Sequence, residues 1–173
     1  MSESLKKLQS HAKQKRLFHG SPVAALTWLE PRPASDVNKA QSFNNDTAVF
    51  ASAEFCLSMI FGIVDAKNMP RDPAITSWSA GGSEEGGLLR ITAKIPEQWR
   101  GHLETGAVGY VYVFSGETFR ESDGIQWKSK VAVEPLDCVA VTLRDFYAAG
   151  GTVEWIPASV SPDKVLQDQA KPS

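Results

Sequence analysis

Cysteine and histidine are scarce in this chain, which has two cysteines and three histidines among its 173 residues. Neither cysteine has a second Cys or His at the spacing of a zinc ligand, so no structural metal site is expected. Cys56 and Cys138 stand far apart, each in an apolar stretch of sequence. This context favours two buried free thiols over a disulfide bridge, as in proteins of a reducing compartment.

The chain also lacks an excess of charge of one sign and a long apolar run. Eighteen basic and twenty acidic side chains give a formal net charge of −2, whereas nucleic-acid-binding proteins usually show a basic excess. No stretch approaches the roughly 20 apolar residues that cross a membrane, and residues 1–16 are too polar for a signal peptide. We therefore expect a soluble, intracellular, cytoplasmic protein that is not secreted and does not bind a membrane.

Length and composition predict one globular domain. A chain of this size hides roughly 70% of its extended surface on folding, which is enough for a full core. Apolar residues make up 42% of the chain and charged residues 22%, as is usual for globular proteins. We expect a polar, basic arm or helix at 1–15, a single domain at 16–158 and a polar tail at 159–173.

Short strands outnumber helices in the expected secondary structure. One helix is predicted at 53–64, where Phe55, Met59, Ile60 and Ile63 form an apolar stripe. Alternating or β-branched apolar residues predict strands at 17–19, 47–52, 88–95, 109–115, 125–133, 138–143 and 152–156.

Two long stretches, 22–46 and 65–87, are expected to be irregular because they are rich in proline or glycine. The glycine-rich run 81–87 resembles a phosphate-binding loop only weakly, since no Gly-Lys-Ser/Thr follows it and a strand comes next. Several short strands around one clear helix indicate an α+β fold with split or curved antiparallel sheets.

Three short motifs follow one another along the chain. They are Leu-Phe-His-Gly-Ser at 17–21, then a strand at 48–52 that leads into the helix bearing Ser58 and Phe61, and finally Ile-Gln-Trp at 125–127. In this order and spacing they resemble the catalytic domain of ADP-ribosyltransferases of the diphtheria-toxin and poly(ADP-ribose) polymerase type. The resemblance covers roughly residues 16–145 and implies split, curved antiparallel β-sheets with few helices.

The resemblance implies that the chain binds NAD, as the substrate of the reaction and without a metal. The imidazole of His19 would hydrogen-bond a ribose hydroxyl on the adenosine side, next to Ser21 of the same motif. The backbone N–H and C=O of Gly20 would hold the nicotinamide carboxamide, because only a residue without Cβ allows so close an approach. Ser58 would donate to the same carboxamide, and Phe61 would stack on the pyridinium ring. Phe61 as an ordinary core residue is the competing interpretation.

Two positions differ from the pattern of the family. Many members have a tyrosine in the second strand, where this chain offers Val49 or Phe50 against the nicotinamide. The late glutamate of the family is replaced by Gln126, which can hydrogen-bond a ribose hydroxyl but carries no charge. Gln126 therefore cannot stabilise the positive charge that develops on the ribose as nicotinamide leaves.

A carboxylate from elsewhere in the chain would restore that stabilisation. Glu117 and Glu121 stand just upstream of Gln126, and Glu134 stands downstream. We take Glu117 and Glu121 as catalytic candidates beside His19 and Gln126, with ordinary solvated loop acids as the alternative.

The resemblance leaves three functions open. The first is NAD-dependent mono-ADP-ribosyl transfer, with release of nicotinamide, to a protein, nucleic acid or small molecule that the sequence does not identify. The second is a catalytically inactive module that binds NAD, ADP-ribose or a macromolecular partner. The third is an RNA 2′-phosphotransferase, an enzyme that relies on several arginines, for which this chain offers Arg16, Arg90 and Arg100.

Overall fold

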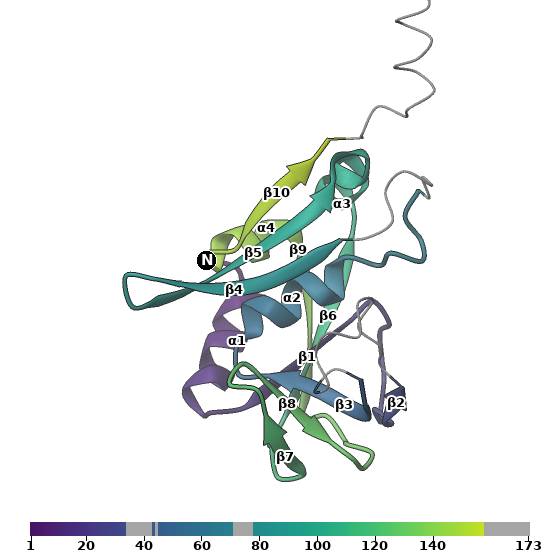
Figure 1. Cartoon of the computed structure of the whole chain (residues 1–173), viewed down its shortest axis with the longest axis vertical. Helices are drawn as coiled ribbons and strands as arrows, with labels where there is room; N and C mark the ends of the chain where they lie inside the picture. The colour runs from purple at the N-terminus through teal and green to yellow at the C-terminus, as the bar shows by residue number, and fades with distance from the viewer. Residues whose placement is uncertain (34–42, 44, 71–77, 158–173) are drawn as a thin grey trace, which may run out of the picture.

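The computed structural model describes residues 1–33, 43, 45–70 and 78–157. Over these residues the chain has an α+β fold with two β-sheets and four α-helices (Figure 1). The α+β class expected from the strand and helix patterns is thus confirmed, and the described strand pairs are antiparallel except for one parallel pair in the smaller sheet. None of the helices in this part of the chain is long and apolar enough to cross a membrane.

The larger sheet has the strand order β7-β8-β3-β1-β6-β9, with the short strand β2 paired to β3. Its strands are β1 (Leu17–Ser21), β2 (Arg32–Pro33), β3 (Thr47–Ser52), β6 (Val108–Phe114), β7 (Phe119–Ser122), β8 (Gln126–Ser129) and β9 (Asp137–Thr142). All its neighbouring strands are antiparallel. β1 therefore lies in the interior of the sheet, between β3 and β6.

The smaller sheet has the order β10-β5-β4, with β4 (Ser79–Glu85), β5 (Leu88–Pro96) and β10 (Thr152–Ile156). The prediction that 65–87 is irregular is wrong for β4, whereas residues 71–77 lie outside the described residues. The glycines at 81 and 82 disfavour a strand locally, but Gly86 and Gly87 both have positive φ and close a two-residue hairpin turn. Pairing with β5 then decides the conformation of β4.

Four α-helices accompany the sheets: α1 (Glu3–Lys13), α2 (Phe55–Ile63), α3 (Arg100–Thr105) and α4 (Leu143–Ala148). The helix predicted at 53–64 is α2, which is apolar around most of its circumference and therefore buried. It packs against β1 and β6 on one side and against β4 and β5 on the other (Figure 1). The short helices α3 and α4 were not expected, since the six residues of each give too short a periodic pattern.

Glycines allow α2 to approach the larger sheet very closely. A Cβ atom on Gly20 of β1 would lie 1.9 Å from the carbonyl oxygen of Ser58 and 2.6 Å from the amide nitrogen of Gly62. On the next strand, a Cβ atom on Gly109 would lie 2.3 Å from the carbonyl carbon of Gly62. The backbone of α2 thus rests directly on the backbone of β1 and β6, and this contact fixes the helix beside the His-Gly motif.

The N-terminal segment forms α1 and packs against β9. Leu5 and Leu8 are buried, and the imidazole Nε2 of His11 lies 2.9 Å from a carboxylate oxygen of Asp137. The tail expected at 159–173 lies outside the described residues. Both cysteines are free, but Cys138 is exposed rather than buried, because its side chain is on the outer face of β9.

Candidate functional site

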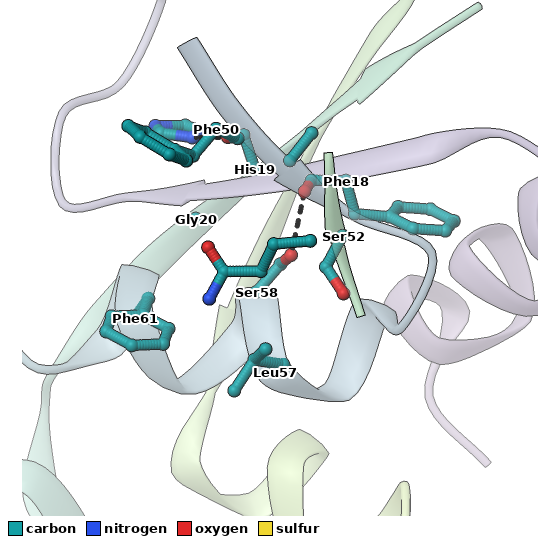
Figure 2. A pocket seen from close by; sticks show the side chains of 10 residues that line it. Phe18, His19, Gly20, Phe50, Ser52, Leu57, Ser58 and Phe61 are labelled. Carbon is teal, nitrogen blue, oxygen red and sulfur yellow. Dashed lines mark hydrogen bonds between the residues drawn. The ribbon is translucent and has the colours of Figure 1, made fainter. Parts of the chain in front are cut away.

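A pocket of about 210 Å³ lies between β1, β3, β8 and the side of α2 (Figure 2). Six of the residues predicted from the motifs line it: His19, Gly20, Phe50, Ser58, Phe61 and Gln126. We call this cavity the first pocket. The three motifs, which are far apart in sequence, are therefore adjacent in the fold.

The first pocket exists because β1 and β3 separate. Every residue of β1 pairs with a residue of β6. Between β1 and β3, by contrast, the pair of Phe18 and Ser52 is the only one among the described residues. Beyond Phe18 the two strands diverge, so β3-facing backbone groups of β1 have no ladder partner in β3. Such unpaired N–H and C=O groups are available for hydrogen bonds to a ligand.

His19 spans the gap between the separated strands. Its Nδ1 lies 2.6 Å from the carbonyl oxygen of Phe50, which can only accept, so Nδ1 carries the proton. Burial lowers the pKa of His19, and the charge of Arg32 adds to this effect, while the bond to Phe50 opposes it. The ring is therefore neutral at pH 7, and Nε2 is an acceptor that no described residue engages in a hydrogen bond.

The lowered pKa of His19 makes the folded state sensitive to mild acid. The unfolded chain takes up the proton near the ordinary value of 6.5, while the folded chain resists it. Stability that is complete above this pH is therefore lost as the pH falls below it, by at most about 1.4 kcal/mol for each pH unit within the window. Urea unfolding over a pH series measures this slope. The slope should vanish in His19→Gln and persist in the control His102→Gln, and equal slopes in the two would contradict the assignment.

The hydroxyl of Ser58 already donates a hydrogen bond within the protein. Its Oγ donates to the carbonyl oxygen of Phe18 at 2.9 Å, and the side chain is buried (Figure 2). What Ser58 offers to the first pocket is a lone pair. It can thus accept a hydrogen bond from the amide group of a carboxamide, instead of donating one as the resemblance implied.

Two aromatic rings face the first pocket from different elements. Phe50 of β3 and Phe61 of α2 lie on opposite sides of it in Figure 2. Phe61 is 42% exposed, so the interpretation of Phe61 as an ordinary core residue is wrong. Its ring lies 5.1 Å from that of Trp78, a supporting residue that the sequence did not single out. The two rings give the first pocket apolar walls, against which a flat heterocycle can pack.

Gln126 is the first residue of β8 and stands opposite Ser52 of β3. Its backbone N–H donates to Asp123 Oδ1 at 2.7 Å, and Ser52 Oγ donates to the carbonyl oxygen of Ile125 at 2.9 Å. These two bonds hold the start of the strand in place. The half-buried amide of Gln126 thus belongs to the first pocket, and no carboxylate is among the described residues that line it.

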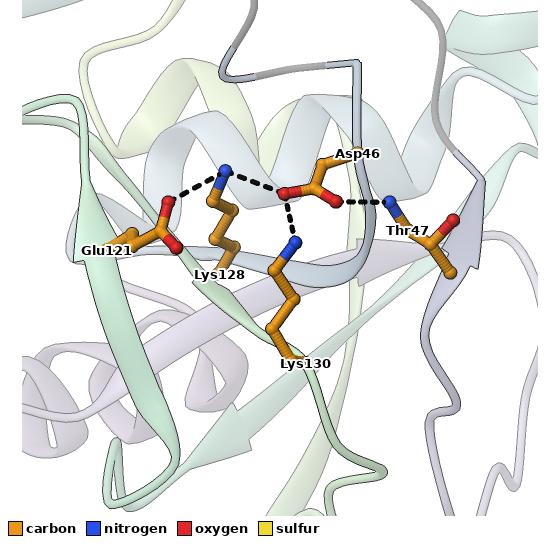
Figure 3. Close-up of polar contacts among 5 residues, drawn as sticks. All are labelled: Asp46, Thr47, Glu121, Lys128 and Lys130. Carbon is orange, nitrogen blue, oxygen red and sulfur yellow. Dashed lines mark hydrogen bonds and ion pairs between the residues drawn. The ribbon is translucent and has the colours of Figure 1, made fainter.

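The two candidate carboxylates lie elsewhere. Glu121 of β7 is 2.9 Å from the amino group of Lys128, which is also 2.9 Å from Asp46 (Figure 3). Lys130 pairs with the same Asp46, and hydrogen bonds from the two lysines hold the pKa of Asp46 below its usual range. Glu117 is exposed in the turn between β6 and β7. Neither glutamate lines the first pocket.

A second pocket, of about 300 Å³, adjoins the first through His19 and Phe50, which line both. Ser21 of the His-Gly-Ser motif lies here, together with Trp28 and Arg32 from the stretch after β1. The sequence did not reveal Trp28 and Arg32, because the irregular segment around Trp28 and the two-residue strand β2 with Arg32 are too short to show periodicity. Adjacent pockets joined by an imidazole and a phenyl ring suit an elongated ligand with two rings.

The three arginines considered for an RNA 2′-phosphotransferase do not converge on one site. Arg90 pairs with Glu85 at the end of the hairpin, and Arg100 packs over the ring of Trp155. Neither these two nor Arg16 is among the residues that line the first or the second pocket.

No family model matches the chain, and no curated protein or solved structure is significantly similar to it.

The chemistry of the site follows from its own groups: a neutral imidazole acceptor, a buried serine lone pair, two aromatic walls and an uncharged amide. Among the described residues, no group of three or more His, Cys, Asp or Glu could hold a metal ion.

Proposed function

We propose that this chain is an NAD-binding domain of the ADP-ribosyltransferase type that transfers a single ADP-ribose unit only slowly. The observation that supports the proposal is the convergence of His19, Gly20, Ser58 and Phe61 on one pocket, next to a second pocket that shares His19. The two sheets and the divergence of β1 from β3 agree with the split sheet that the resemblance implies.

In this proposal the first pocket holds the nicotinamide. The pyridinium ring lies between Phe50 and Phe61, and the carboxamide donates to Ser58 while it meets the backbone of β1 at Gly20. The second pocket holds the adenosine and its phosphates, where Arg32 supplies a positive charge. Nε2 of His19 accepts a hydrogen bond from a ribose hydroxyl between the two pockets.

The reaction breaks the bond between the ribose carbon and the nicotinamide nitrogen, and the electron pair leaves with nicotinamide. A nucleophile of the acceptor then forms the new bond to the ribose carbon and loses its proton. The ribose is positively charged in the transition state, so a carboxylate beside it would lower the barrier. Gln126 can hold a ribose hydroxyl but adds no charge, so binding is retained and transfer is slow.

Binding of NAD is the first expectation to test. A ligand that binds only the folded chain adds about 2.7 kcal/mol to the free energy of unfolding at a hundredfold excess over Kd, and so raises the unfolding midpoint. Thermal unfolding with NAD, ADP-ribose and nicotinamide should show a shift for each in the wild type. His19→Ala should weaken NAD and ADP-ribose about tenfold through loss of one hydrogen bond.

The matched control is His102→Ala, because His102 is exposed on α3 and distant in the chain from all three motifs. This variant should bind like the wild type. The proposal would be overturned if none of the three compounds shifted the midpoint, or if both histidine variants lost affinity equally.

A further inference from the structure

Tyr112 of β6 is a fully buried tyrosine whose hydroxyl reaches the segment that follows β1. The hydroxyl donates to the carbonyl oxygen of Val23 at 2.5 Å and accepts from the backbone N–H of Leu26 at 3.1 Å. Burial raises the pKa of Tyr112, so the group keeps its proton and can serve both partners at neutral pH. One side-chain oxygen thus closes a turn that belongs to a different part of the chain.

Besides Tyr112, Ser21 Oγ accepts a hydrogen bond from the backbone N–H of Val23 at 3.1 Å, and Cys138 contacts the backbone of Ala25, but apolar packing of the turn is sparse. Of residues 22–28 only Leu26 is partly buried, and Val23 and Trp28 are 52% and 56% exposed. Ala25, between the two backbone groups that Tyr112 binds, has φ of 57°, a conformation that costs free energy for any residue except glycine. Such a conformation persists only where surrounding contacts impose it, and the Tyr112 hydroxyl supplies two of them.

The same turn forms one wall of the second pocket and takes no part in the first. Val23, Leu26 and Trp28 line the second pocket only. We propose that Tyr112 is a positioning residue: it holds the 22–28 turn in the shape that receives the adenosine diphosphate part of the ligand. The inference rests on the proposed function for the identity of the ligand, but the ordering of the turn is independent of it.

The test compares Tyr112→Phe with Tyr110→Phe. The first variant keeps the buried ring and removes both hydrogen bonds to the turn. The second removes a hydroxyl from the same face of β6 that no described residue engages in a hydrogen bond. Calorimetric titration with ADP-ribose and with nicotinamide separates the two pockets. Tyr112→Phe should weaken ADP-ribose about tenfold, because the turn must be ordered on binding, and leave nicotinamide unchanged. Tyr110→Phe should change neither.

Hydrogen exchange of peptides spanning 22–29 gives a readout that needs no ligand. Exchange at Leu26 should accelerate in Tyr112→Phe and stay slow in Tyr110→Phe. Equal weakening of both ligands by Tyr112→Phe, or unchanged ADP-ribose binding and exchange, would overturn the inference. If the wild type bound neither ligand, the proposed function would fail, while the exchange data would still decide whether Tyr112 orders the turn.

Discussion

Gln126→Glu should accelerate the release of nicotinamide from NAD by about two to three orders of magnitude, the range measured for single groups that stabilise transition-state charge. Gln126 already lies in the first pocket, held by the hydrogen bond from its backbone N–H to Asp123 Oδ1 and by the bond from Ser52 Oγ to the neighbouring carbonyl of Ile125. The substitution exchanges one amide nitrogen for an oxygen and keeps the shape of the side chain. It therefore adds the missing charge at little structural cost.

The new carboxylate should stay ionised at neutral pH. Residues 126 and 128 are two apart on β8, so their side chains are on the same face of the strand. The ammonium group of Lys128 thus faces the same side as the introduced acid and favours its charged form. Lys128 already contacts Asp46 and Glu121, which limits its direct pairing with a third carboxylate.

The rate is measured as nicotinamide released under saturating NAD, with affinity checked by titration so that a change in kcat is separated from one in binding. Gln126→Met removes the amide without adding charge and should be slower than the wild type. Glu121→Gln should leave the rate unchanged, because Glu121 is paired with Lys128 outside the first pocket. An unaltered rate in Gln126→Glu, with NAD still bound, would show that residue 126 is not beside the reacting carbon.

The parts of the site that could be predicted from the sequence are those encoded by short local motifs. The strand at 47–52 and the helix after it follow from apolar patterns, and they bring Ser58 beside the His-Gly strand. The position of Glu121 could not be predicted in the same way. It is near Gln126 in sequence, but the antiparallel register of β7 and β8 places it opposite Lys128 instead. Strand register is set by the whole sheet and not by distance along the chain.

The residues that line the second pocket could not be predicted from the sequence for a different reason. Trp28 lies in the irregular 22–28 turn, which the hydroxyl of Tyr112 on a distant strand helps to fix, and Arg32 lies in the two-residue strand β2. In sequence Tyr112 is simply one of the alternating residues of β6. A single long-range hydrogen bond leaves no periodic signal, so its partner becomes visible only in the fold.

The structure gives Gly20 a role in packing that the sequence did not predict. The sequence assigned its missing Cβ to the close approach of a carboxamide, whereas the structure shows the backbone of α2 in the space that a Cβ would need. The atoms that a Cβ on Gly20 would meet, at 1.9 Å in Ser58 and 2.6 Å in Gly62, belong to the backbone and cannot rotate away. Any larger residue must displace the helix from β1.

Gly20→Ala should therefore lower the free energy of unfolding by about 3 kcal/mol, the upper part of the range for overpacked cores. In a domain of this size the unfolding midpoint should fall by about 10 °C. Gly81→Ala is the matched control, since a Cβ there meets no atom within 4 Å. Its stability should change by less than about 0.5 kcal/mol.

Unfolding and NAD titration on the same samples distinguish the two roles of Gly20. If the helix contact dominates, Gly20→Ala is unstable, and ligand affinity is lost together with the native position of α2, Ser58 and Phe61. If the variant unfolded like the wild type but no longer bound nicotinamide, the glycine would be required by the ligand alone. Wild-type stability together with wild-type affinity would contradict both the close packing of α2 on β1 and the placement of the carboxamide at Gly20.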